Sequence, residues 1–394
     1  MWVAYFLNYC DRQAAFSMFP SLKSNLKMSD EQLGLIGAAF LWVYAFGCPI
    51  AGQLADRFSK RVLVVLSLAV WSIVTIATGF AASATMMLAL RALMGISESL
   101  YMPTAIALTA NAHPPELRSR AIATLTTAQI AGTVAGSWFG GWMADHGQWR
   151  CAFFVLGAVG VLYALPYFLF LRTVNEGTAT ATVAARPAFA INALIKVPTF
   201  LLLCVVFPIF VFGLWLLYGW LPTFLHDKFS INQSDAAFNA TVFLQGATLI
   251  GLLGGGLLAD VLYRRTKAAR LWLMVASLVL CAPCLHALGN SDTLNVTRIA
   301  AAAFGLFSGL LMGNVFPAAF DVVPAGTRAS AVGALNFFGA LMSGFATLFG
   351  GLWKKSLGID RLLTLTAIAY ALAGVALIAG ITAFFRRDCE RIHQ

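Results

Sequence analysis

The chain has 394 residues, of which 60% are hydrophobic and only 11% are charged, and its mean hydropathy is +0.81. Soluble domains carry about 25% charged residues, so this composition excludes a soluble globular protein. The formal net charge of +10 would suit a nucleic-acid-binding protein, but the positions of the basic residues do not.

Apolar stretches of about 20 residues, each long enough to cross roughly 30 Å of hydrocarbon, recur from one end of the chain to the other. We therefore expect an all-α, multi-pass integral membrane protein with twelve membrane-spanning helices. The expected spans are residues 1–22, 32–56, 62–81, 85–110, 121–144, 151–171, 197–224, 236–259, 270–289, 296–320, 329–352 and 361–384.

The basic residues lie mainly on one side of these spans. If the first span runs outward, sixteen of them fall in inner segments and eight in outer loops. By the positive-inside rule, both termini are expected in the cytoplasm, so the basicity reflects topology and no nucleic acid is expected as a partner. No cleavable signal peptide is expected, because no basic segment precedes the first apolar run. The chain begins inside the first expected span, which leaves open whether an N-terminal segment is missing.

The first expected span carries Asp11 and Arg12, and the fourth carries Arg91 and Glu98. A charge at the bilayer centre costs about 2.5–3.5 kcal/mol even on the lowest scales, so such residues usually line a functional cavity. Arg91 and Glu98 are almost two helical turns apart and share one face, whereas Asp11 and Arg12 point roughly 100° apart and should reach different partners. The alternative is a purely structural set of ion pairs.

The charges of these four residues sum to zero, which suggests a mechanism. A bound monoanion would make the cavity negative, and the uptake of one proton would restore neutrality, so anion and proton should bind together. We expect Glu98 to be the first choice for the proton-carrying group and Asp11 the second. Arg12 and Arg91 should bind a substrate carboxylate. The expected coupling ion is H⁺, and no cofactor or metal is expected.

The chain also repeats itself. The sequence GQLADR at 52–57 recurs as GLLAD at 256–260, and LRSRA at 117–121 recurs as TRASA at 327–331. Two repeated motifs in the same order indicate that the two halves of the chain are related by a parallel repeat. We expect a first bundle at 1–171, a small and polar cytoplasmic linker at 172–196, and a second bundle with a basic tail at 197–394.

A glycine pattern accompanies the repeat. In the fifth expected span Gly132, Gly136 and Gly140 fall on nearly one face. Such a stripe of small residues allows another helix to approach closely.

The run G-x-L-A-D-R-x-S-K-R at 52–61 resembles the loop signature of the major facilitator superfamily, and Arg91 to Gly95 with Glu98 and Pro103 resembles its fourth-helix signature. The resemblance covers essentially the whole chain. It implies two six-helix bundles, transport by alternating access and no enzymatic activity. A monomer in a bacterial inner membrane is expected. The five histidines are scattered, which also disfavours an enzyme.

Within the superfamily, Asn8-Tyr9-Cys10-Asp11-Arg12 and the Arg91/Glu98 pair resemble the anion:cation symporters. That resemblance implies a substrate such as a sugar acid or another carboxylate, bound at these residues. Tyr44 stands in the second span, near the place where sugar-acid importers commonly have glutamine. Pro49 to Gly52 and Ser59 to Arg61 instead resemble the spinster group of lysolipid transporters, so a lysolipid carrier stays open. A non-transporting sensor is a third alternative.

The second half offers aromatic and amide side chains instead of charges. They are expected to help bind the substrate: Trp215, Tyr218, Gln245, Asn314 and Asn336. Each amide has an alternative role, a hydrogen bond to a neighbouring helix backbone. The two aromatic residues have packing as their alternative.

The loop signature implies a cytoplasmic gate. By resemblance, Asp56 and Asp260 hold the inner face closed, with Arg118 and Arg328 as candidate partners. The remaining gate residues are Gly52, Arg57 and Arg61. The alternative is a set of solvated loop charges. Asp321, at the inner end of the tenth span, is expected at this gate rather than in the cavity.

Overall fold

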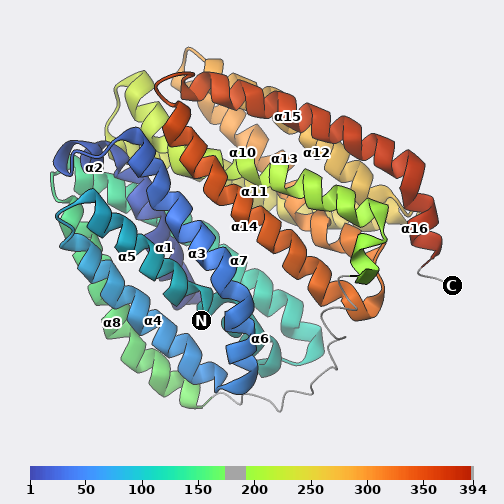
Figure 1. Cartoon of the computed structure of the whole chain (residues 1–394), viewed down its shortest axis with the longest axis horizontal. Helices are drawn as coiled ribbons and strands as arrows, with labels where there is room; N and C mark the ends of the chain where they lie inside the picture. Colours follow the sequence, from blue (N-terminus) through green and yellow to red (C-terminus); the bar gives the residue numbers. More distant parts are fainter. Residues whose placement is uncertain (174–191, 392–394) are drawn as a thin grey trace. The chain divides into compact units, whose positions relative to one another are not determined.

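The structure is a computed structural model that describes residues 1–173 and 192–391. Within its helices, the side chains of residues 52, 55, 56, 110, 111, 115, 116, 118–120, 122, 123, 325 and 329 are not described. The regular elements of the described ranges are all helical (Figure 1). They are α1 (Trp2–Ser17), α2 (Phe19–Asn25), α3 (Asp30–Arg57), α4 (Lys60–Gly79), α5 (Ala84–Ser99), α6 (Tyr101–Ala112), α7 (Pro115–Asp145), α8 (Trp149–Arg172), α10 (Pro198–Phe229), α11 (Gln233–Tyr263), α12 (Ala269–Asn290), α13 (Leu294–Phe320), η1 (Ala325–Thr327), α14 (Arg328–Trp353), α15 (Ile359–Gly380), η2 (Ile381–Phe385) and α16 (Arg386–Glu390).

The expected all-α membrane fold is confirmed. Within the described residues, nine helices are long and apolar enough to cross a membrane: α3, α4, α8, α10, α11, α12, α13, α14 and α15 with its continuation. Helices α1, α5 and α7 are not among them, and α1 and α5 have only 16 residues each. The count of twelve spans and the placement of both termini stay predictions.

The expected fourth span is divided in two at Leu100. Helix α5 ends at Ser99 and α6 begins at Tyr101. Pro103 explains the division, because a proline has no N–H to donate to the carbonyl four residues earlier and its ring collides with that carbonyl, here the one of Ser99. The break therefore lies directly beside Glu98.

The glycine stripe of α7 packs against α1, as expected. A Cβ atom at Gly136 would collide with the backbone of Cys10, and one at Gly132 would collide with the carbonyl oxygen of Phe6. The two backbones can approach this closely only because both positions lack a side chain. The approach holds the Asp11 region of α1 in one fixed position.

Local sequence also sets where helices begin. At the start of α3, Ser29 Oγ accepts from the Gln32 N–H at 3.1 Å and Gln32 Oε1 accepts from the Ser29 N–H at 3.0 Å. This reciprocal pair satisfies two N–H groups that the first helical turn leaves free. Ser59, Ser83 and Thr293 cap α4, α5 and α13 in the simpler one-way form.

The chain forms two compact units. The first contains Met1–Ala179, Trp215–Thr241 and Gly344–Lys355, and the second contains Thr180–Leu214, Val242–Ser343 and Ser356–Gln394. Helices α10, α11 and α14 therefore each contribute residues to both units. The division into bundles at 172–196 stays a prediction, and residues 174–191 of the expected linker lie outside the described residues.

In the first unit, the carboxylate at the end of α7 caps a different helix. Asp145, the last residue of α7, accepts hydrogen bonds from the backbone N–H groups of Gln233 and Ser234 at 2.8 Å each and from the Ser234 hydroxyl at 2.6 Å. These groups belong to the first turn of α11, whose free N–H groups and dipole favour a negative charge. Asp145 therefore caps α11 from a different helix.

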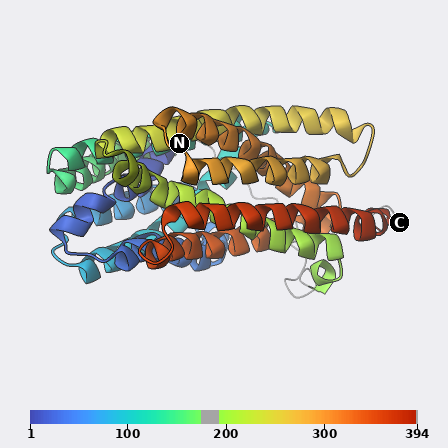
Figure 2. The ribbon, with the colours of Figure 1, turned by 90° about the horizontal axis from the view of Figure 1, so that it is seen from above.

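In the second unit, α12 packs against α13 and α15. Figure 2 shows α15 as a long red helix that continues through the π-helix η2 into α16 at the C-terminus. Asp388 of α16 accepts from the backbone N–H and the hydroxyl of Thr199 at 2.9 and 2.7 Å. The C-terminal helix is thereby tied to the first turn of α10.

Candidate functional site

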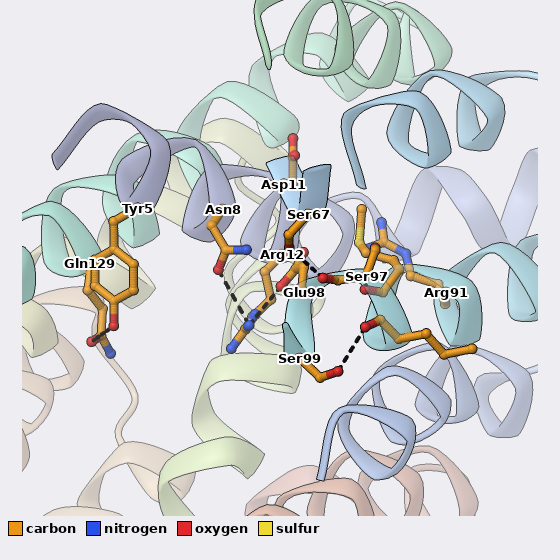
Figure 3. A network of polar contacts seen from close by, with 12 residues as sticks. Tyr5, Asn8, Asp11, Arg12, Ser67, Arg91, Ser97, Glu98, Ser99 and Gln129 are labelled. Carbon is orange, nitrogen blue, oxygen red and sulfur yellow. Dashed lines mark hydrogen bonds and ion pairs between the residues drawn. The ribbon is translucent and has the colours of Figure 1, made fainter. Parts of the chain in front are cut away.

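The four charged residues predicted to lie in membrane spans are all buried in the first unit. The exposed fractions of Asp11, Arg12, Arg91 and Glu98 are 1%, 5%, 2% and 0%. Arg12 Nη2 lies 2.8 Å from Glu98 Oε2, which makes an ion pair between α1 and α5 (Figure 3). The structure thus brings together charges from two helices that are far apart in the sequence.

Arg12 is held by further contacts on α1 and α3. Its Nη2 atom lies 3.5 Å from Asn8 Oδ1, one turn earlier on α1. The centre of its guanidinium lies 4.8, 4.6 and 5.3 Å from the ring centres of Tyr9, Phe40 and Tyr44. A planar guanidinium among aromatic faces is stabilised by their negative π-clouds. This cage fixes Arg12 toward Glu98.

Asp11 faces a different helix, as expected from its position next to Arg12. Figure 3 shows its side chain pointing away from the Arg12–Glu98 pair. Its Oδ2 atom lies 3.3 Å from Thr75 Oγ1 of α4, and its Oδ1 atom has no hydrogen-bond partner among the described residues. No cationic nitrogen of the described residues lies within ion-pair distance of this carboxyl group.

Arg91 has the poorest set of partners. Its Nη1 atom lies 3.4 Å from the sulfur of Met94, and its guanidinium lies 5.4 Å from the ring centre of Phe153. Its Nε and Nη2 atoms have no hydrogen-bond partner in the described part of the chain, and no described carboxylate pairs with it. A buried guanidinium has five N–H donors that need acceptors. Arg91 is therefore a buried cation with free donors.

Arg12 and Arg91 border the same small, partly open void. It has a volume of about 10 Å³ and is also lined by Ala15, Phe16, Ile36, Gly37 and Phe40. That volume accommodates about one water molecule. Two guanidinium groups facing one space can bind an anion between them, but a molecule of several atoms needs a wider cavity than this conformation has.

Serine side chains fix the end of α5 around Glu98. Ser67 of α4 donates to the Ser97 carbonyl at 2.5 Å, and Ser97 donates to the Met94 carbonyl at 2.9 Å. The first of these bonds joins α4 to α5 one residue before Glu98 (Figure 3). It gives the Ser97 carbonyl, which lies in the last turn of α5, a hydrogen-bond donor.

Three other predicted substrate residues lie in the first unit. Tyr44 contacts Arg12 as described above, and Trp215 packs on the same apolar cluster as Tyr44 and Phe40. The rings of Trp215 and Tyr218 contact each other at 5.7 Å. Tyr44 and Trp215 thus share a cluster with the cage of Arg12.

The three predicted amides belong to the second unit. Asn314 Nδ2 donates to the backbone carbonyls of Gly255 and Leu310 at 3.2 and 2.8 Å, which corresponds to the alternative role of bonding a neighbouring helix. Gln245 is buried and Asn336 is exposed. The structure does not bring these three amides into one hydrogen-bonded cluster.

The predicted gate residues of the first unit are only partly described. Arg61 Nη1 donates to the carbonyl of Arg172 at 3.2 Å, and Arg57 is exposed. Gly52 and the side chains of Asp56 and Arg118 are not described, so the predicted pairing of Asp56 with Arg118 stays a prediction.

In the second unit, the strongest ion pair of the predicted gate region involves a residue that the sequence did not single out. Arg270 Nη1 lies 2.6 and 2.9 Å from the two oxygens of Asp321, whereas Arg270 Nη2 lies 3.9 Å from Asp260. Burial raises the pKa of Asp321, and Arg270 opposes that rise. Arg328 lies 5.4 Å from the ring of Phe320. In the sequence, Arg270 looks like any other inner-loop charge.

Two further residues of the central cluster have weak sequence signals. Asn8 belongs to the Asn8–Arg12 signature, but its contact with Arg12 depends on the helical spacing of four residues. Thr75 lies in an apolar span, where a single threonine gives no signal.

Among the described residues, no group of three His, Cys, Asp or Glu side chains could hold a metal ion.

Comparisons with known proteins identify the family of the chain. Residues 1–347 match the family model of the Major Facilitator Superfamily. The chain is 28% identical to the "Probable sulfoacetate transporter" of Cupriavidus necator, over 97% of this chain and 91% of that protein. It is 26% identical to "Protein spinster" of Drosophila melanogaster, over 71% of this chain and 48% of that protein.

A solved structure has a similar fold. It is described as a bacterial homolog to the human lysosomal transporter Spinster in an inward-facing and occupied conformation. The TM-score is 0.83 at 22% sequence identity, over 98% of this chain and 96% of that one. The chain is an integral membrane transporter of the bacterial inner-membrane type rather than an enzyme, and it belongs to the Major Facilitator Superfamily.

Proposed function

We propose that the protein is a proton-coupled symporter of a small organic anion that works by alternating access. The observation that supports this most is Arg91, which is buried, has free N–H donors, pairs with none of the described carboxylates and borders a void together with Arg12. Guanidinium groups bind carboxylates and similar anions through paired hydrogen bonds.

Charge balance connects the anion to a proton. Arg12 and Glu98 neutralise each other at 2.8 Å, which leaves Arg91 and Asp11. When Asp11 is neutral, the cluster carries one positive charge, which a bound monoanion cancels. When Asp11 is ionised, the cluster is already neutral, and an anion would add an unfavourable buried charge. Protonation of Asp11 and binding of the anion therefore favour each other.

We propose Asp11 as the proton-carrying group in place of Glu98, the first choice from the sequence. Glu98 has the Arg12 cation at 2.8 Å, whereas Asp11 has no cation within ion-pair distance among the described residues. A buried carboxylate without a paired cation costs several kcal/mol, so this environment favours the neutral acid. Glu98 then has the role of holding Arg12 in place.

The size of the void gives the proposal a conformational requirement. A space of about 10 Å³ admits about one water, so an organic anion needs a second conformation in which Ala15 and Phe16 of α1 separate from Ile36 and Phe40 of α3. Exchange between a closed and an open arrangement is what alternating access requires.

The test uses purified protein in proteoliposomes with an imposed pH gradient. Uptake is measured for radiolabelled sulfoacetate, hexuronates and short dicarboxylates, and the anion that gives the largest proton-driven uptake is kept as the probe. Asp11→Asn should lose the response to the pH gradient but keep exchange of labelled for unlabelled probe, because it mimics the neutral acid. Arg91→Met should lose both. Asp235→Asn, at an exposed position of α11, is the control.

The coupling assignment is wrong if Asp11→Asn retains full proton-driven uptake. If Glu98→Gln alone loses the gradient response and keeps exchange, the proton is carried by Glu98.

A lysolipid carrier is the second candidate, supported by the sequence match to a spinster protein over 71% of this chain. The same charged cluster would then bind a headgroup phosphate, because phosphate and carboxylate present similar oxygens to a guanidinium. A thermal-shift screen of organic anions against lysophospholipids separates the two candidates. Stabilisation by lysophospholipids alone would favour the second.

A further inference from the structure

Thr75 of α4 is fully buried and makes two contacts through one hydroxyl group. Its Oγ1 atom lies 2.9 Å from the backbone carbonyl oxygen of Trp71 and 3.3 Å from Asp11 Oδ2. A hydroxyl group has one proton to donate and two lone pairs that accept. It therefore cannot donate to both oxygens at the same time, and one of these contacts must run in the opposite direction.

The distances indicate which contact receives the proton. The Trp71 carbonyl can only accept, and it lies 0.4 Å closer to the hydroxyl (3.3 Å minus 2.9 Å). A hydroxyl that donates to an ionised carboxylate usually lies at about 2.5–2.7 Å. The 3.3 Å separation from Asp11 is far longer than this. With its proton on the Trp71 carbonyl, the Thr75 hydroxyl presents a lone pair to Asp11 Oδ2, and a neutral carboxyl group can donate its proton to that lone pair.

We propose that Thr75 is a positioning residue that favours the protonated form of Asp11 by accepting a hydrogen bond from it, while donating its own proton to the Trp71 carbonyl. The inference rests on the proposed role of Asp11 as the proton carrier. Loss of the proton from Asp11 would force Thr75 either to leave the Trp71 carbonyl or to face the carboxylate with a lone pair. Thr75 thereby raises the pH at which Asp11 takes up its proton.

The groups around Asp11 act on the same proton. The charged groups near Asp11 that come from α5 are Glu98 and Arg91. On α1 itself, Cys10 and Arg12 are the neighbours in sequence. Gly136 of α7 lies against Cys10 on α1 and brings no titratable group. Helix α4 contributes Trp71 and Thr75. Substituting Thr75 leaves all of these groups in place, so a change in the pH midpoint of Asp11 protonation can be attributed to the Thr75 hydroxyl group.

The proton balance is simple. A hydrogen ion from the side of higher acidity forms the O–H bond on the Asp11 carboxylate, and that bond breaks when the ion leaves to the other side. No electron moves, and no further reactant is needed. Thr75 keeps its own proton throughout.

The experiment titrates Asp11 without a substrate. Full-length protein in lipid vesicles is followed by infrared difference spectroscopy between pH values, and the carboxylic-acid C=O band that disappears in Asp11→Asn is assigned to Asp11. Thr75→Val, which has nearly the same shape but no hydroxyl, should move the midpoint of this band to lower pH by about one unit, the equivalent of one hydrogen bond. Thr75→Ser should restore it.

Thr78 provides a matched control on the same helix. It is equally buried and donates to the Val74 carbonyl at 2.8 Å, but no described carboxylate bonds to it. Thr78→Val should therefore leave the midpoint unchanged. If Thr75→Val does not fold, Thr75→Ala gives the same reading.

The outcomes separate this inference from the proposed function. If no band depends on Asp11, the proton carrier is misassigned. If the band depends on Asp11 but Thr75→Val leaves its midpoint unchanged, Thr75 is only a packing residue. A midpoint that moves to higher pH would mean that Thr75 donates to the ionised carboxylate, and this would overturn the inference.

Discussion

Two substitutions of buried arginines by methionine should change stability in opposite directions. Methionine approximates the length of arginine and removes its charge. Arg12→Met leaves Glu98, which is 0% exposed, without the cation that lies 2.8 Å from it. Breaking a buried ion pair from one side costs about 3–5 kcal/mol. We therefore expect a markedly lower thermal unfolding temperature.

Arg91→Met should instead be neutral or stabilising. Arg91 is 2% exposed, has two nitrogens without described partners and pairs with no described carboxylate. Its charge therefore bears a desolvation cost that no close ion pair offsets, and its removal should stabilise the fold by about 1–2 kcal/mol. For large domains, 1 kcal/mol shifts the unfolding temperature by about 2–4 °C. We expect a rise of a few degrees together with a complete loss of anion binding.

The assay compares unfolding temperatures in detergent by intrinsic fluorescence, with probe uptake measured in proteoliposomes. Arg361→Met, at an exposed position of α15, is the control and should change neither quantity. The cost of Arg12→Met should shrink at low pH, because Glu98 can then take up a proton. If Arg91→Met lowers the unfolding temperature as much as Arg12→Met, Arg91 has a stabilising partner beyond the contacts described above.

Two further substitutions test the packing of the first unit by the same unfolding assay. Overpacking a protein core typically costs about 1–3 kcal/mol. Gly136→Leu should cost more than this, because its Cβ would already collide with the Cys10 backbone. A retained unfolding temperature would contradict the close approach of α7 and α1. Asp145→Ala should cost about 1–2 kcal/mol, because α11 loses its cap. Asp235→Ala, at an exposed position nearby, should cost less, and equal losses would exclude the cap.

Composition and local patterns along the chain were sufficient to predict the class of the protein and the identity of its polar core. Hydropathy and spacing are properties of consecutive residues, so the membrane helices and the glycine stripe of α7 were predictable. The same holds for Asp11, Arg12, Arg91 and Glu98, because a charge in an apolar stretch is visible without any fold. The perpendicular directions of Asp11 and Arg12 also follow from helix geometry alone.

Which of these charged groups meet depends instead on long-range packing between helices. Helix geometry predicts that Asp11 and Arg12 reach different partners but does not say which: Arg12 lies 2.8 Å from Glu98, and Asp11 faces Thr75. Such pairings depend on how each helix is rotated and which helix lies beside it. That rotation is set by close contacts such as the one between α7 and α1, and the glycine stripe of α7 does not by itself say which helix it will contact.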